Sequence, residues 1–124
     1  MDNSDHKIDF NYLDNMLRLS KGNPRFVTEM VNRFIKTSTK DMADIRSFKN
    51  TMDRESLKQR SHKFISSCSV VGAMQMIEIC HLLSKKSDGE TNDMINARID
   101  ELDREYDYTL KSLQDYLNKL YAAA

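Results

Sequence analysis

The chain has 124 residues, enough for one domain with a single core. Its 19 Lys and Arg side chains balance 19 Asp and Glu, and this zero net charge argues against a general nucleic-acid binder. Three glycines and one proline are too few for the many turns of an all-β fold. With neither an apolar run of roughly 18 residues nor a signal-peptide pattern, we expect a cytoplasmic, monomeric domain without membrane contact.

The first predicted element is a short helix near the N-terminus. Apolar residues recur at helical spacing just after Asp9, which can cap the helix while Ile8 packs back on Leu13. Asn23 and Pro24 then mark a boundary, because asparagine suits the residue before a helix and proline suits its first position. The sequence therefore predicts a second helix that begins at this point.

A long helical segment follows Pro24. Its apolar residues recur at steps of three and four as far as Phe48 or Met52, which is typical of an amphipathic helix. The pattern thins at residues 37–39, so the segment is either one long helix or two helices separated by a bend. Asp53 can cap the next helix. The buried stripe of that helix comprises Leu57, Ser61, Phe64 and Cys68.

Two further helices complete the prediction. Gly72 marks a break, a helix follows over residues 73–83, and the longest helix covers residues 95–120. Matching apolar stripes and short connections favour antiparallel packing within one molecule. We predict an all-α fold, an antiparallel four-helix bundle with a short additional N-terminal helix. The predicted divisions are a flexible N-terminus (1–7), the domain (8–120) and a frayed tail (121–124).

The sulfur-containing side chains fit the same core. Cys68 and Cys80 both lie in apolar helical patterns, and without an export signal we interpret them as reduced core residues rather than a disulfide. Most of the eight methionines are expected on core stripes, and a methionine-lined binding groove is the alternative.

One histidine has a position that suits chemistry. On an ideal helix, with about 100° per residue, His62 lies near 140° from Leu57 and so projects from the polar face. A neutral imidazole is a good nucleophile toward phosphorus, and Lys58 one turn earlier or the adjacent Lys63 can offset phosphoryl charge. From the spacing alone, the alternative that His62 is an exposed surface histidine without any role remains open. The neighbours on this polar face include Lys58, Gln59, Ser66 and Ser69.

Residues 62–73 resemble the signature of histidine-containing phosphotransfer domains. In that family a hydrophobic residue follows the active histidine at +2, Lys at +3 and Gly at +4, then come small residues, and Gly-Ala stands at +10 and +11. Matches to the pattern are Phe64, Ser67, Gly72 and Ala73. The similarity of helix order extends over residues 8–120.

The resemblance implies a phosphorelay intermediate. His62 would accept a phosphoryl group from a receiver-domain aspartate and pass it to another receiver domain. The implied partners are response-regulator receiver domains and a sensor histidine kinase. The chain itself would be a phosphocarrier without kinase activity or cofactor, since Mg²⁺ would belong to the partner receiver. It could act alone or as part of a hybrid sensor kinase.

Two positions depart from the family pattern. Ile65 stands where the family has lysine, and Ser66 stands where it has glycine. We expect Lys58 to replace the missing charge and Ser66 to affect how closely a receiver approaches. These departures leave a second hypothesis, a degenerate helical adaptor that docks receiver domains without transferring phosphate.

Other constellations are weaker. Glu78 and His81 have the spacing of a di-iron motif, but such sites need a second pair and further carboxylates, so we expect no metal and a partly buried His81. His6 lies in the N-terminal segment and is expected to be inert. No glycine-rich nucleotide loop is present, which argues against a kinase.

Overall fold

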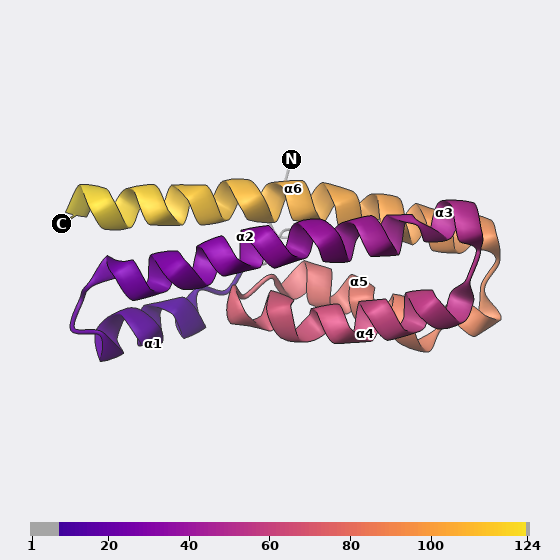
Figure 1. Ribbon diagram of the computed structural model, residues 1–124, viewed down its shortest axis with the longest axis horizontal. Coiled ribbons are helices and arrows are strands. Elements are labelled where there is room, and N and C mark those ends of the chain that lie inside the picture. The colour runs from indigo at the N-terminus through magenta and orange to yellow at the C-terminus, as the bar shows by residue number, and fades with distance from the viewer. Residues whose placement is uncertain (1–7, 124) are drawn as a thin grey trace.

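The computed structural model describes residues 8–123, which form an antiparallel helical bundle (Figure 1). The described chain contains no sheet and only one isolated backbone bridge, so the all-α prediction is confirmed. The flexible terminus predicted for residues 1–7 lies outside the described part. The elements are α1 (Asn11–Leu19), α2 (Pro24–Arg46), the short α3 (Phe48–Thr51), α4 (Arg54–Val70), α5 (Met74–Lys85), the 3-10 turn η2 (Ser87–Gly89) and α6 (Asn92–Ala123).

The helices differ in length, and this difference shapes the bundle. α2 and α6 run along its whole length, whereas α4 and α5 form a shorter hairpin against one half of them (Figure 1). α1 occupies the remaining space beside the first half of α2. Its Asp14 carboxylate accepts a hydrogen bond from the Tyr116 hydroxyl of α6 at 2.5 Å. α1 thus completes the end of the bundle that the hairpin does not reach.

The predicted caps of α2 and α4 are confirmed. Asn23 Oδ1 accepts a hydrogen bond from the Arg25 amide at 3.0 Å, with Pro24 in the first helical position. Asp53 Oδ1 accepts one from the Ser56 amide at 3.1 Å. Each bond satisfies an amide that the first helical turn leaves unpaired.

α2 is continuous through residues 37–39, so the alternative of two helices is wrong. The apolar pattern thins there because a polar pair occupies the core: the buried Ser38 hydroxyl hydrogen-bonds with the Tyr106 hydroxyl of α6 at 2.8 Å. At the far end of this segment Phe48 is buried and Met52 is exposed. Met52 adopts a left-handed conformation, with φ of 53°, and ends α3.

The turn between α4 and α5 is joined to the start of α1. Gly72 has φ of +71°, and its carbonyl accepts a hydrogen bond from the Asp9 amide at 2.7 Å. A Cβ at Gly72 would lie 1.5 Å from the Asp9 carbonyl oxygen, so only glycine fits. Ile8 pairs with Ala73 through the backbone. The prediction that Ile8 staples back on Leu13 missed this partner, which comes from a distant part of the chain.

The core contains both cysteines, free and fully buried, as predicted. The hydrogen bond that the Cys68 thiol donates to Cys80, together with burial, raises the pKa of Cys68. The two side chains therefore meet between α4 and α5.

Most of the described methionines lie on core stripes, as expected: Met42 and Met76 are buried, and Met16 and Met30 pack partly buried against the core. Met52, Met74 and Met94 are exposed at helix ends, where the core does not extend. The tail expected from residue 121 is helical as far as Ala123. No helix within residues 8–123 is both long and apolar enough to cross a membrane.

Candidate functional site

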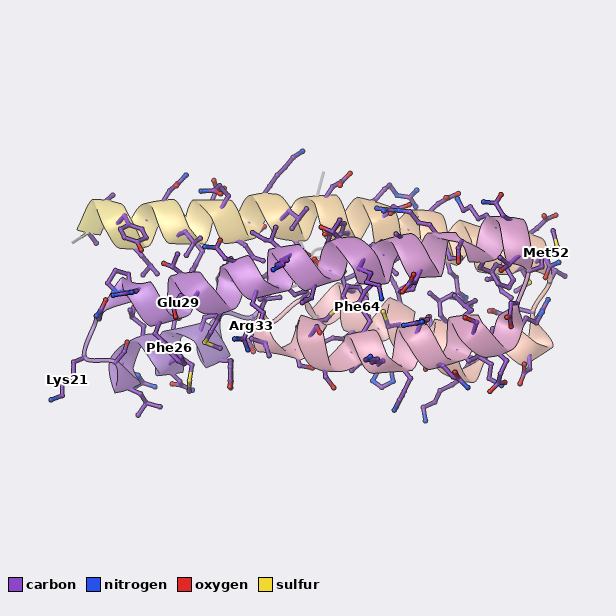
Figure 2. The ribbon with its side chains drawn as sticks, viewed as in Figure 1. Lys21, Phe26, Glu29, Arg33, Met52 and Phe64 are labelled. Atoms are coloured by element: carbon purple, nitrogen blue, oxygen red, sulfur yellow. The ribbon has the colours of Figure 1, made fainter. Side chains whose placement is uncertain are left out.

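His62 lies in the middle of α4 and is exposed, as the helical wheel predicts. Its neighbours Ser61 and Phe64 are buried and determine how α4 is rotated. Figure 2 shows Phe64 between α4 and α2, where its ring stacks on Phe34 with centroids 6.3 Å apart. Since this stripe faces the core, the imidazole two residues before Phe64 faces solvent.

A hollow of about 240 Å³ between α4 and α5 contains His62. Three of the predicted residues, Lys58, Gln59 and His62, come together here. Ser84 and Lys85 of α5 line the same hollow, and the sequence interpretation missed both. Their place follows from the hairpin: in antiparallel helices joined at Gly72, positions at similar distances on either side of the turn lie opposite each other.

The Lys58 amine is engaged in ion pairs. Lys58 Nζ lies 2.8 Å from Asp88 Oδ2 in η2 and 3.8 Å from Glu55 Oε2. The hydrogen bond to Asp88 is the main reason that the pKa of Lys58 is raised. The amine therefore stays protonated, but the carboxylates of Asp88 and Glu55 already partly neutralise its positive charge. Gln59 Nε2 also turns to Glu55, donating a hydrogen bond to Oε1 at 3.4 Å.

The remaining predicted residues do not join this hollow. Ile65 is half-buried against the core, and Ser66 is exposed. The Ser69 hydroxyl donates a hydrogen bond to the Ile65 carbonyl at 2.9 Å. Lys63, although adjacent to His62 in sequence, lines a different groove between α2 and α4. Of the predicted residues, Lys63 thus lies on a different side of α4 from His62.

The groove between α2 and α4 has a volume of about 540 Å³ and a basic rim. Its apolar floor is continuous with the surface around the half-exposed Phe26 of α2 (Figure 2). Asp41 also lines it, and burial, followed by the nearby Asp44, raises the pKa of the Asp41 carboxyl. The basic residues that line the groove are Arg33, Lys36, Lys40, Arg60 and Lys63.

The signature residues that match are mainly structural. Phe64 anchors α4, while Gly72 and Ala73 are buried in the turn that meets α1. The family model of the Hpt domain matches residues 29–123. The chain belongs to the Hpt domain family. Hpt domains take part in histidine phosphotransfer and are phosphocarriers, not kinases. No curated protein and no solved structure matches the chain significantly.

The match to the Hpt domain begins inside α2 and leaves out α1. In this chain α1 is nevertheless bound to the matched part, through Gly72 and through Tyr116. The packed unit is therefore longer than the matched segment.

The prediction of a partly buried His81 is wrong, because His81 is exposed. On α5 it lies on the side opposite the buried stripe of Met76, Ile79, Cys80 and Leu83. Glu78 is exposed as well. Within residues 8–123, His, Cys, Asp and Glu form no group of three or more that could hold a metal ion.

Proposed function

We propose that His62 of this Hpt domain is the phosphoryl acceptor of a phosphorelay. The observation that supports this proposal is an exposed imidazole in a hollow that two lysines also line. The resemblance of residues 62–73 to the family signature aligns His62 with the family's active histidine. Hpt domains typically interact with receiver domains and histidine kinases. The donor is a phosphoaspartate of one response-regulator receiver domain, and the final acceptor is the aspartate of another.

The transfer step needs little from this chain beyond position and charge. The Nε2 lone pair attacks phosphorus as the P–O bond to the receiver aspartate breaks, and that aspartate leaves as a carboxylate. The ring keeps its proton on Nδ1. Attack by the aspartate of a second receiver reverses these bonds. Mg²⁺ belongs to the receiver, and Lys58 can offset phosphoryl charge only if its ion pair with Asp88 opens.

Other polar residues of α4 form the surface that a receiver approaches. Gln59, Ser66 and Ser69 are exposed on the same side of α4 as His62, and their short or flexible side chains leave the ring accessible. We place the relay in the cytoplasm, where free thiols such as Cys68 persist. The domain acts as a monomer, alone or within a hybrid sensor histidine kinase.

Radiolabel transfer tests the proposal. Incubation with a phosphorylated receiver should give an acid-labile, base-stable label on the chain. His62→Gln should abolish the label while helix content, measured by circular dichroism, is unchanged, because His62 is exposed. His81→Gln, which changes the other exposed histidine of the described chain, should keep the label. A label that survives His62→Gln would overturn the assignment.

A non-transferring adaptor is the second candidate, and Ile65 favours it. This residue is half-buried and cannot supply the charge that the family lysine supplies. The double variant Ile65→Lys, Ser66→Gly restores both family residues. A slow parent chain that this variant accelerates would be a degenerate domain, whereas a fast parent chain excludes the adaptor.

A further inference from the structure

The signature of the family does not assign Lys85, which lies on a different helix from His62. We propose that Lys85 supplies the free positive charge that binds the phosphoryl group on His62. This inference rests on the proposed function, because it names the residue that stabilises the same phosphohistidine.

Lys85 lies in the same hollow as His62 and has no acidic partner in the described part of the chain. Lys85 is the last residue of α5, is exposed, and lines the 240 Å³ hollow together with His62. Within residues 8–123, no carboxylate lies within 4.0 Å of its amine. The negative end of the α5 dipole favours a cation at this place. Its long side chain lets the ammonium group follow a phosphoryl group on Nε2.

Each of the two lysines of α4 is engaged with other groups, so neither supplies a free charge to His62. Lys58 lines the hollow too, but its amine is 2.8 Å from Asp88, and using its charge requires that ion pair to open. Lys63 lines the groove between α2 and α4, where its charge acts on Asp41. Among the described residues that line the hollow, Lys85 is thus the cation without a carboxylate partner.

Lys85 explains how this chain could function with Ile65 at the position of the family lysine. A family lysine at this position would come from α4, whereas here a side chain from the facing helix brings the charge to the same histidine. A phosphoryl group carries close to two negative charges, and an ammonium group binds it by charge-assisted hydrogen bonds. Because the site is open to solvent, the effect of one lysine on the transfer rate is about two- to fivefold.

Transfer kinetics with the full chain test the inference. Lys85→Met approximately keeps the length of the side chain and removes its charge, so the maximal rate of transfer from a phosphorylated receiver to His62 should fall about two- to fivefold. The receiver concentration for half-maximal rate should change little, since the ammonium acts on the phosphoryl group. Lys85→Arg should retain most of the rate. Lys86→Met is the matched control outside the hollow and should transfer normally.

A second measurement does not require a receiver. Phosphoramidate, a small phosphoryl donor, phosphorylates exposed histidines directly, and His81→Gln confines that reaction to His62 among the described histidines. The ammonium resonance of Lys85 should then shift in the NMR spectrum, and His62→Gln should abolish the shift. The ammonium resonance of Lys119, near the far end of α6, should not move.

The outcomes separate the two proposals. A chain that receivers label normally but that Lys85→Met does not slow would refute the role of Lys85 and leave the relay function intact. Slowing by Lys58→Met alone would assign the charge to Lys58 instead. A chain that no receiver labels, but whose Lys85 resonance responds to phosphoramidate, would refute the relay and retain the Lys85 contact.

Discussion

Phe64 is the side chain that keeps His62 on the surface. It is 1% exposed and stacks on Phe34, so Phe64→Ala should lower the free energy of unfolding by about 3–5 kcal/mol. Urea denaturation followed by circular dichroism measures the loss. Phe26→Ala is the control, because Phe26 is 48% exposed on α2 and should cost below about 1 kcal/mol. A similar small loss for Phe64→Ala would contradict the rotation of α4.

Local periodicity explains why the radial positions of single residues were predictable. Burial of Phe64 and exposure of His62 both follow from their angles on one helix, and no knowledge of other helices is needed. The surroundings of His62 are different. The ion pair between Lys58 and Asp88 and the approach of Lys85 depend on how α4 and α5 pack, which a wheel of α4 alone does not contain.

At the scale of elements, the turn at Gly72 decides how α1 joins the bundle. Gly72→Ala would place a Cβ 1.5 Å from the Asp9 carbonyl oxygen at a φ of +71°, so the backbone contact with α1 must open. We expect a loss of at least about 2 kcal/mol in stability, measured by urea denaturation. Amide hydrogen exchange should be fastest in α1.

Gly22 offers a matched control for this change. It also has a positive φ, +80°, but a Cβ there would meet nothing within 4 Å. Gly22→Ala should therefore cost only the conformational part, about 1 kcal/mol. Equal losses at Gly22 and Gly72 would mean that the contact with Asp9 contributes no stability.

Helix starts were easier to predict than helix partners. Asn23 and Asp53 act within a few residues of their own positions, so the sequence alone identifies them as caps. Ile8 pairs with Ala73, and Ser38 with Tyr106, across the fold. Such contacts between distant positions leave no periodic signal in either segment. This is why the pairing of Ile8 with Ala73 was missed and why the bend at 37–39 was plausible from the sequence but wrong.

For the whole molecule, the zero net charge conceals an uneven distribution. α2 and α4 together carry nine basic and four acidic side chains, whereas α6 carries four basic and seven acidic ones. Both grooves that flank α4 have basic residues at their edges. The zero net charge therefore describes the whole molecule, whereas the side that carries His62 is basic.

Alkylation of the two buried cysteines measures how often the α4–α5 hairpin opens. Only the thiolate reacts with alkylating reagents, and in the folded chain Cys68 and Cys80 are inaccessible and the pKa of Cys68 is raised. Iodoacetamide should therefore modify them only in molecules whose α4–α5 hairpin has separated. The modification rate, followed by mass spectrometry, should equal the unfolded-state rate multiplied by the opened fraction. Rapid modification without denaturant would contradict this packing.

The raised pKa of Cys68 also determines how the stability of the fold changes with pH. Above the ordinary thiol pKa, the unfolded chain loses a proton that folded Cys68 retains, so the free energy of unfolding falls as the solution becomes more alkaline. Below that pH the stabilising contribution is complete. Alkylation thus accelerates with pH for two reasons, because more thiolate is present and because a larger fraction of molecules is open, and its rate reports the fraction of molecules in which the two halves of the hairpin are apart.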